Sequence, residues 1–275
     1  MVNYPLALEK TESSYDTIAQ FYDEFRGTDE RFYDVTVKRL WIHLWVLLFG
    51  YKADMGMFLD LGCGTGANSL YLGEAGYKGV GIDLSAKMIE IASKRAREKG
   101  SGVDFIKGDI TALSLTQKFK CIFSNEVIVH LKDFTLVEKV FNDCYGLLED
   151  GGFFFFQFCT DAWLKKMSSG GQEAFPHFSW RYKGTYDAER HRGIFDYAFD
   201  FNDGHRVSSI LTFNSYEFGQ VEKGLRSAGF QDIKFFEADP RVHLKDGVVG
   251  NVDFHPVAPD ACAVMCLAMK KAAGN

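Results

Sequence analysis

Short apolar stretches alternate with stretches of helical period from residue 56 onward, and this alternation restricts the fold more than any other feature of the sequence. The apolar stretches read MGMFLDL (55–61), KGVGID (78–83), VDFIKGD (103–109), KCIFSNE (120–126) and GFFFFQF (152–158). Helical stretches separate them, such as residues 85–100, which begin at an N-cap serine and end at a glycine. Strands alternating with helices predict a parallel sheet with helices on both of its faces.

The segments that flank this alternation follow other patterns. SSYDTIAQFYDEF (13–25) has helical period and begins with Ser13 and Asp16 in a possible capping box. A second helix is expected at about 29–49. Residues 160–192 read as irregular, and IFDYAFDF and HRVSSILTF then flank Asn202-Asp203-Gly204, which predicts a β-hairpin. A helix from Ser215 to about Gly229 and two apolar strands close the chain.

Three glycines, Gly62, Gly64 and Gly66, occupy five positions directly behind the first apolar stretch. Glycine at this density lets a ligand approach the backbone closely. Gly62, Gly64 and Ala67 also satisfy the dinucleotide pattern G-x-G-x-x-G/A. The loop alone therefore leaves open a dinucleotide and S-adenosylmethionine.

Carboxylates at the ends of three successive strands separate these two ligands. The spacing along the sequence between Gly62 and Asp83 is the one at which a carboxylate accepts the ribose hydroxyls of either ligand. Asp60 would repel a pyrophosphate but attract an ammonium and a sulfonium. Asp109 follows the third strand, within reach of an adenine amino group. Ligands of open α/β sheets bind at these strand ends, so the pattern favours S-adenosylmethionine.

Composition argues against several other classes of protein. The formal net charge of −6 and the lack of a broad Lys/Arg cluster argue against a nucleic-acid partner. The most apolar stretch, residues 40–51, is about half of what a membrane-spanning helix needs. No cysteine spacing indicates a metal site, and the scattered cysteines together with a start unlike a signal peptide predict a reduced, cytoplasmic protein.

These motifs resemble the class I S-adenosylmethionine-dependent methyltransferases. FLDLGCGTG resembles their first motif, GVGIDLS followed by Met88 their second, and FIKGDI their adenine-binding motif. FSNEVIVHL, LLEDGGFFFFQF and SYEFGQVEKGLRSAGFQDIKFFE resemble later elements, so the likeness covers about 55–160 and 215–270. YDTIAQFYD is similar to the first helix of the branch that methylates small metabolites.

The resemblance implies a Rossmann-like, seven-stranded, mostly parallel sheet whose last strand is antiparallel. We expect one methyltransferase domain over residues 1–275, with an N-terminal helical cover at 1–50 and an inserted substrate lid at 160–214 that contains the hairpin. The resemblance further implies S-adenosyl-L-methionine as the cofactor and an oxygen or nitrogen of a small molecule as the methyl acceptor. We expect a monomer or a homodimer.

The resemblance also implies the residues that contact the cofactor. The methionine moiety is expected to meet Asp60, Gly62, Cys63, Gly64 and Asn125, the ribose to meet Asp83, the adenine to meet Leu84, Met88, Asp109 and Ile110, and the whole cofactor to lie beneath Tyr15 and Tyr22. Cys63 is expected to fit a tight turn and to take no part in the chemistry.

Candidates for the acceptor side come from the residues themselves. An amine or hydroxyl acceptor must lose a proton, and His177 or His130 can accept it. The aromatic residues of FPHFSWRYKGTYD suggest a pocket wall for the acceptor: Phe178, Trp180, Tyr182 and Tyr186. Packing of these rings against the hairpin explains the same pattern. Two other functions stay open, an NAD-dependent oxidoreductase and a cofactor-binding protein without catalytic activity.

Overall fold

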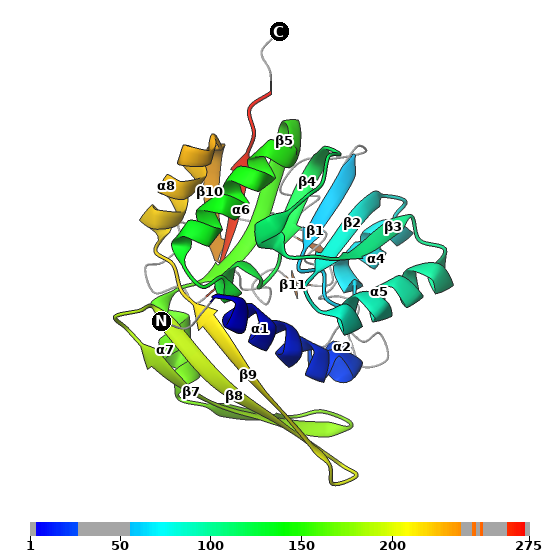
Figure 1. Cartoon of the computed structure of the whole chain (residues 1–275), viewed down its shortest axis with the longest axis vertical. Coiled ribbons are helices and arrows are strands. Elements are labelled where there is room, and N and C mark those ends of the chain that lie inside the picture. The colour runs from blue at the N-terminus through cyan, green and yellow to red at the C-terminus, as the bar shows by residue number, and fades with distance from the viewer. Residues whose placement is uncertain (1–3, 27–55, 238–243, 246–247, 250–262, 273–275) are drawn as a thin grey trace.

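A seven-stranded sheet forms the centre of the computed structural model, which describes residues 4–26, 56–237, 244–245, 248–249 and 263–272 (Figure 1). Its strand order is β10-β13-β5-β4-β1-β2-β3. The strands are β1 (Met57–Leu61), β2 (Lys78–Asp83), β3 (Val103–Lys107), β4 (Phe119–Ser124), β5 (Leu148–Cys159), β10 (Gln231–Glu237) and β13 (Ala263–Met269). Helices α4 (Ala67–Glu74), α5 (Ala86–Lys99), α6 (Phe134–Leu147) and α8 (Phe218–Ala228) connect them.

Strand direction follows the prediction. β1 lies between β2 and β4 and pairs with both in parallel, and the pairs β2–β3 and β4–β5 are parallel as well. β13 pairs with β5 and β10 in antiparallel orientation, so the predicted antiparallel last strand is confirmed. Since the parallel strands all end at one edge, the loops after β1, β2, β3 and β4 are brought together there.

The phenylalanine-rich strand β5 lies in the core. Phe153, Phe154, Phe155, Phe156 and Phe158 are all buried, as expected for a strand covered on both faces. The rings of Phe154 and Phe156 stack with centroids 4.7 Å apart, and Phe141 of α6 packs against both. α6 and α8 pack against each other, and Phe218 of α8 contacts Phe158.

The insert between β5 and α8 is a second, antiparallel sheet in the order β6-β7-β8-β9. It consists of α7 (Asp161–Ser168), β6 (Gly171–Ala174), β7 (Phe178–Asp187), β8 (Arg192–Phe201) and β9 (Arg206–Asn214). The predicted hairpin is confirmed as β8 and β9. The reading of 160–192 as irregular was wrong, because α7, β6 and β7 occupy most of it. Residues of β7 alternate between two faces and pair along the full length of β8.

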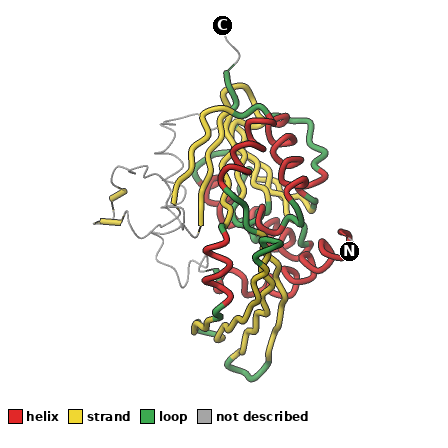
Figure 2. Tube along the Cα trace, turned by 90° about the vertical axis from the view of Figure 1, so that its left-hand side faces the viewer, coloured by secondary structure: helices red, strands yellow, loops and turns green. Residues whose placement is uncertain are grey.

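The N-terminal segment lies between the carboxyl edge of the large sheet and the insert, as Figures 1 and 2 show. It comprises α1 (Tyr4–Ile18), a 3-10 turn (Ala19–Phe21) and α2 (Tyr22–Phe25). α1 begins well before Ser13, so no capping box forms there, and Asp16 accepts a hydrogen bond from Ser85 instead. The helix expected at 29–49 lies outside the described residues.

Two further short strands, β11 (Leu244–Lys245) and β12 (Val248–Val249), pair with each other, and 3-10 turns follow β3 (Ile110–Ala112) and β4 (Ile128–His130). Within the described part of the chain, no helix has the length and apolar character needed to cross a membrane.

Phe156→Ala should lower the free energy of unfolding by about 3–5 kcal/mol, because it removes a fully buried ring and leaves a cavity between β5 and α6. Ile210→Ala, at a side chain that is 57% exposed, is the control and should change stability by less than about 0.5 kcal/mol. Urea unfolding followed by circular dichroism measures both. Equal losses for the two variants would contradict the assignment of β5 to the core.

Candidate active site

The glycine loop after β1 is held in place by the end of β2. The backbone N–H groups of Gly62 and Cys63 both donate to the carbonyl oxygen of Ile82, at 2.7 and 2.9 Å. Gly62 has φ +75°, and a Cβ there would lie 2.1 Å from a methyl group of Val127. Gly64 has φ +53°, and the nearest atom to its would-be Cβ is in the ring of Tyr22, at 3.6 Å. The loop thus needs glycine for backbone conformation at both positions, and a Cβ at Gly64 would be in van der Waals contact with the Tyr22 ring.

Asp83 stands at the end of β2 beside this loop. One carboxylate oxygen accepts a hydrogen bond from the Gly64 N–H at 2.8 Å, and the other accepts from the Ser85 N–H at 2.9 Å. Burial raises the pKa of Asp83, and these hydrogen bonds act in the opposite direction. The backbone N–H of Leu84 is a third donor, so of the about four acceptor positions on the two oxygens at least one is left for a ligand.

Asp109 begins the turn after β3. One of its oxygens accepts from both the backbone N–H and the hydroxyl of Thr111, at 2.8 Å each. Neither of these two hydrogen bonds uses the other carboxylate oxygen of Asp109. Ile110 beside it is buried, which gives the site an apolar wall next to a polar rim.

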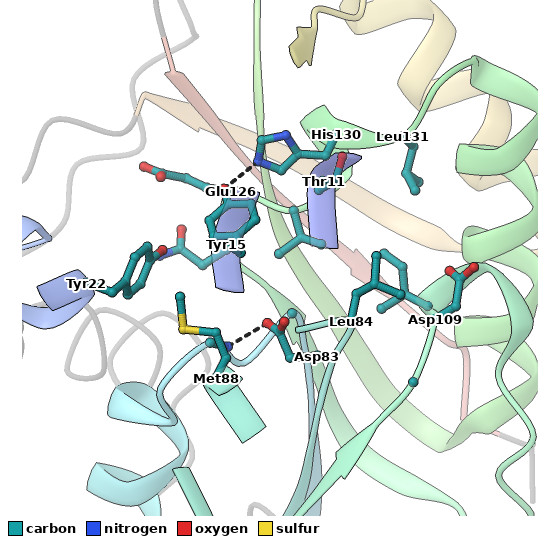
Figure 3. A pocket seen from close by; sticks show the side chains of 16 residues that line it. Thr11, Tyr15, Tyr22, Asp83, Leu84, Met88, Asp109, Glu126, His130 and Leu131 are labelled. Carbon is teal, nitrogen blue, oxygen red and sulfur yellow. Dashed lines mark hydrogen bonds between the residues drawn. The ribbon is translucent and has the colours of Figure 1, made fainter. Parts of the chain in front are cut away.

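A cavity opens between these loops and the N-terminal segment (Figure 3). The cavity is lined by Thr11, Tyr15, Tyr22, Gly62, Gly64, Asp83, Leu84, Met88, Gly108, Asp109, Ile110, Asn125, Glu126, Val127, His130 and Leu131.

Most of the residues predicted to bind the cofactor therefore share one cavity, although Asp60 and Cys63 are not among its lining residues. Asp60 is buried behind the loop and accepts a 2.6 Å hydrogen bond from Ser69 of α4. Burial raises the pKa of Asp60 to about 7. Burial also raises the pKa of the Cys63 thiol, which stays protonated and unreactive.

His130 and Tyr15 form a hydrogen-bonded pair on the cavity wall. The Tyr15 hydroxyl lies 2.8 Å from Nε2 of His130, and Nδ1 lies 2.8 Å from the carbonyl oxygen of Thr212. A carbonyl can only accept, so Nδ1 carries the proton and Nε2 accepts from Tyr15. Burial lowers the pKa of His130 and raises that of Tyr15, so both are neutral at neutral pH.

Glu126 acts on both members of this pair through its carboxylate, since its charge raises the pKa of Tyr15 and that of His130. Its backbone lies in the left-handed region with φ +57°, a strained conformation for a residue with a side chain. Its carboxylate pairs with the guanidinium of Arg26, which follows α2. Burial raises the pKa of the neighbouring Tyr22 to about 12, and the charge of Glu126 adds to this effect.

His177 lies outside the lining of this cavity. Its Nδ1 is 2.7 Å from a carboxylate oxygen of Glu24, its backbone N–H donates to the other oxygen, and its side chain is 60% exposed. The structure places it where the insert meets α2. Its role as a proton acceptor stays a prediction.

The four aromatic residues predicted to bind the acceptor are also not among the lining residues. Phe178 is buried against Phe21, with ring centroids 5.3 Å apart, and Trp180 stacks on Tyr182 at 4.6 Å. Tyr186 is hydrogen-bonded to Asp161. These contacts match the packing alternative, except that Nε1 of Trp180 is buried without a hydrogen-bond partner.

Several lining residues were not predicted as site residues from the sequence: Thr11, Gly108, Glu126, Val127 and Leu131. Four of them adjoin predicted site residues in the loops after β3 and β4, so a wider window around each motif would have included them. Thr11 lies on α1 and carries no such signal. Among the described residues, no group of His, Cys, Asp and Glu is arranged to hold a metal ion.

Comparisons with known proteins agree with this geometry. A family model described as a methyltransferase domain matches residues 58–152. The ubiquinone biosynthesis O-methyltransferase of Parvibaculum lavamentivorans is 29% identical over 170 residues, which are 62% of this chain and 58% of the relative. The phosphoethanolamine N-methyltransferase 1 of Triticum aestivum is 32% identical over 96 residues, which are 34% of this chain and 19% of the relative.

A solved S-adenosylmethionine-dependent methyltransferase from Clostridium acetobutylicum has the same fold. Its TM-score is 0.74 at 18% sequence identity, and the match covers 94% of this chain and 99% of that chain. This likeness extends through the insert and the N-terminal segment, whereas the match to each of the two curated relatives spans less than two thirds of the relative's length.

Gly64→Ala should weaken binding of S-adenosylhomocysteine by about tenfold or more, because the new methyl group enters the cavity from a strained backbone. Gly76→Ala is the matched control, since Gly76 also has a positive φ, +92°, and has no atom within 4 Å of a would-be Cβ. Both variants should lose similar stability in thermal unfolding, and calorimetry should show weaker binding only for Gly64→Ala. Normal affinity in the Gly64 variant would mean that the loop is only a turn.

Proposed function

We propose that this chain, which belongs to the class I S-adenosylmethionine-dependent methyltransferase family, transfers the methyl group of S-adenosylmethionine to an oxygen or nitrogen atom of a small molecule. The observation that carries the proposal is one cavity with unused hydrogen-bond acceptors at the ends of β2 and β4. The carboxylate of Asp83 keeps at least one acceptor position, and Oδ1 of Asn125 is buried without a partner.

The residues of the cavity fit this cofactor. Asp83 would accept the two ribose hydroxyls, and Leu84, Met88 and Ile110 offer apolar contacts for the adenine on the side where Asp109 can accept from its amino group. Asn125 would accept a hydrogen bond from the ammonium of the methionine end. Tyr15 and Tyr22 would cover the ligand from the N-terminal segment.

Bound S-adenosylmethionine supplies an activated methyl group on a sulfonium. The chain must then align the acceptor, exclude water and take up a proton. The neutral Nε2 of His130 can take the hydroxyl proton of Tyr15, while Tyr15 takes the proton of the acceptor. The carbonyl of Thr212 holds the other ring nitrogen and stabilises the imidazolium that forms.

The acceptor would reach the cofactor near Tyr15, Tyr22, Glu126 and His130, which line one part of the cavity. The insert at 160–214 would cover this side of the cavity, because its His177 contacts Glu24 of α2 and Tyr22 of the same helix lines the cavity. Both oxygen and nitrogen are proposed as acceptor atoms, because one relative is named an O-methyltransferase and another an N-methyltransferase.

Methyl-labelled S-adenosylmethionine tests the activity against a pool of small metabolites. Transfer of label to a small molecule supports the proposal. Tight binding of S-adenosylhomocysteine without any transfer would favour a binding protein, and saturable binding of NADH instead would favour the oxidoreductase.

Asp83→Ala should weaken S-adenosylhomocysteine binding by about tenfold or more, because charge-assisted hydrogen bonds of about 1.5–3 kcal/mol each are lost. Asp104→Ala removes an exposed carboxylate from β3 and is the control for net charge. Calorimetry measures both affinities. An affinity of the Asp83 variant within about threefold of the wild type would remove this residue from the ribose site.

His130→Gln should lower the rate of label transfer by about 100-fold, since general bases contribute about 10²–10⁴. In the wild type the rate should fall as the pH drops through the pKa of His130, which burial lowers from its ordinary value, because the protonated ring can no longer accept. His205→Gln changes an exposed histidine in the β8–β9 turn and should leave the rate unchanged. A flat pH profile in the wild type would argue against a basic role for His130.

A further inference from the structure

We propose that Asp23 is a positioning residue that couples docking of the N-terminal segment, residues 4–26, to the conformation of the glycine loop. The cofactor is then held tightly only while this segment, which we call the cover, is docked. The inference rests on the proposed function, because its ligand is the cofactor of that reaction.

Asp23 contacts both the glycine loop and α5. It is only 6% exposed, and it accepts a 2.6 Å hydrogen bond from the hydroxyl of Thr65, which stands between Gly64 and Gly66. Its other oxygen pairs with Arg95 of α5. Arg95 also contacts the carbonyl oxygen of Thr65 at 3.4 Å, so all three residues restrain one another.

Thr65 transmits this contact to the site. It is 2% exposed and lies in the middle of the loop, so its orientation fixes the peptide groups on both sides of it. The N–H of the preceding residue, Gly64, donates to Asp83, the expected ribose ligand. A shift of Thr65 would therefore move a hydrogen bond that orients Asp83.

The residues beside Asp23 place the cover over the cavity. The Tyr22 ring lies 3.6 Å from the would-be Cβ of Gly64, and it lines the cavity. Glu24 is 8% exposed and binds His177 of the insert. Asp23 and Glu24 thus attach α2 to the sheet domain and to the insert through two adjacent buried carboxylates.

Polar contacts also attach the cover to the ends of β2, β3 and β4. Glu12 pairs with Lys107 at the end of β3, Asp16 accepts from Ser85 after β2, and Arg26 pairs with Glu126 after β4. Lys107 and Glu12 are partly exposed, and exposed ion pairs contribute little to stability. Asp23 is the carboxylate of this set that is almost fully buried, so its loss leaves Thr65 without its acceptor inside the protein.

Docking of the cover and binding of the cofactor should therefore favour each other. Tyr15 and Tyr22 reach the cavity only when α1 and α2 are docked, and the loop that Asp23 holds is the one that meets the ligand. If docking raises cofactor affinity, the cofactor must stabilise docking by the same factor.

Thr65→Val and Thr65→Ser form a matched pair for the test, because they differ in whether the hydroxyl that meets Asp23 is present. Asp23→Ala removes the partner, and Glu98→Gln, which breaks an exposed pair with Lys94 on α5, is the control. The probe is S-adenosylhomocysteine, with its dissociation constant from calorimetry and its dissociation rate from stopped flow, at a temperature where circular dichroism shows each variant folded.

We expect Thr65→Val and Asp23→Ala to raise both the dissociation constant and the dissociation rate by about tenfold or more, and the double variant to add less than about threefold to the larger effect. Thr65→Ser and Glu98→Gln should stay within about threefold of the wild type. If Asp23→Ala does not fold, Thr65→Val tests the same contact from the other side.

Affinity and dissociation rate within about threefold of the wild type in folded Thr65→Val, combined with weakened binding in Asp83→Ala, would overturn the inference and leave the proposed function standing. A lower melting temperature with unchanged binding would do the same, since it would assign the contact to folding alone. A wild-type chain that does not bind S-adenosylhomocysteine would overturn both.

Discussion

The parallel pairing of β1 with β2 and β4 is the constraint on which the site depends. Parallel strands need crossover connections and end at the same edge, so the loops that follow them converge. The glycine loop, Asp83 and Asn125 come from three different strand ends and face one cavity for this reason. The phenylalanine-rich strand β5 extends the same sheet and supplies the buried apolar surface that holds these edges in place.

A site at the edge of a sheet is open on one side, and here α1 and α2 close it. Two neighbouring carboxylates, Asp23 and Glu24, are buried between the sheet domain and the insert. Burying a carboxylate is costly unless it is paired and hydrogen-bonded, and both are. These two buried charges therefore fix the orientation of a four-residue helix, and the first residue of this helix, Tyr22, lines the cavity.

Burial also sets the protonation states at the cavity. Tyr15 and Tyr22 keep their protons because desolvation raises their pKa values, and His130 stays neutral because desolvation lowers its own. A neutral imidazole that accepts from a phenol can receive a proton at neutral pH. The fixed partner of its other nitrogen, the carbonyl of Thr212, comes from the insert, so the insert takes part in the site through backbone rather than through its aromatic residues.

The sequence by itself determined what local patterns encode. Apolar periodicity predicted the strands of the large sheet and the β8–β9 hairpin but missed α7, β6 and β7, and the glycine spacing with Asp83 and Asp109 predicted the loops that line the cavity. Only the tertiary structure decided which residues meet across the fold. It placed Asp60 behind the loop, His177 against Glu24, and Asp23 on Thr65. Such contacts join segments that are distant in the sequence. The local sequence around a carboxylate does not show whether that carboxylate faces solvent, a ligand or a buried hydroxyl.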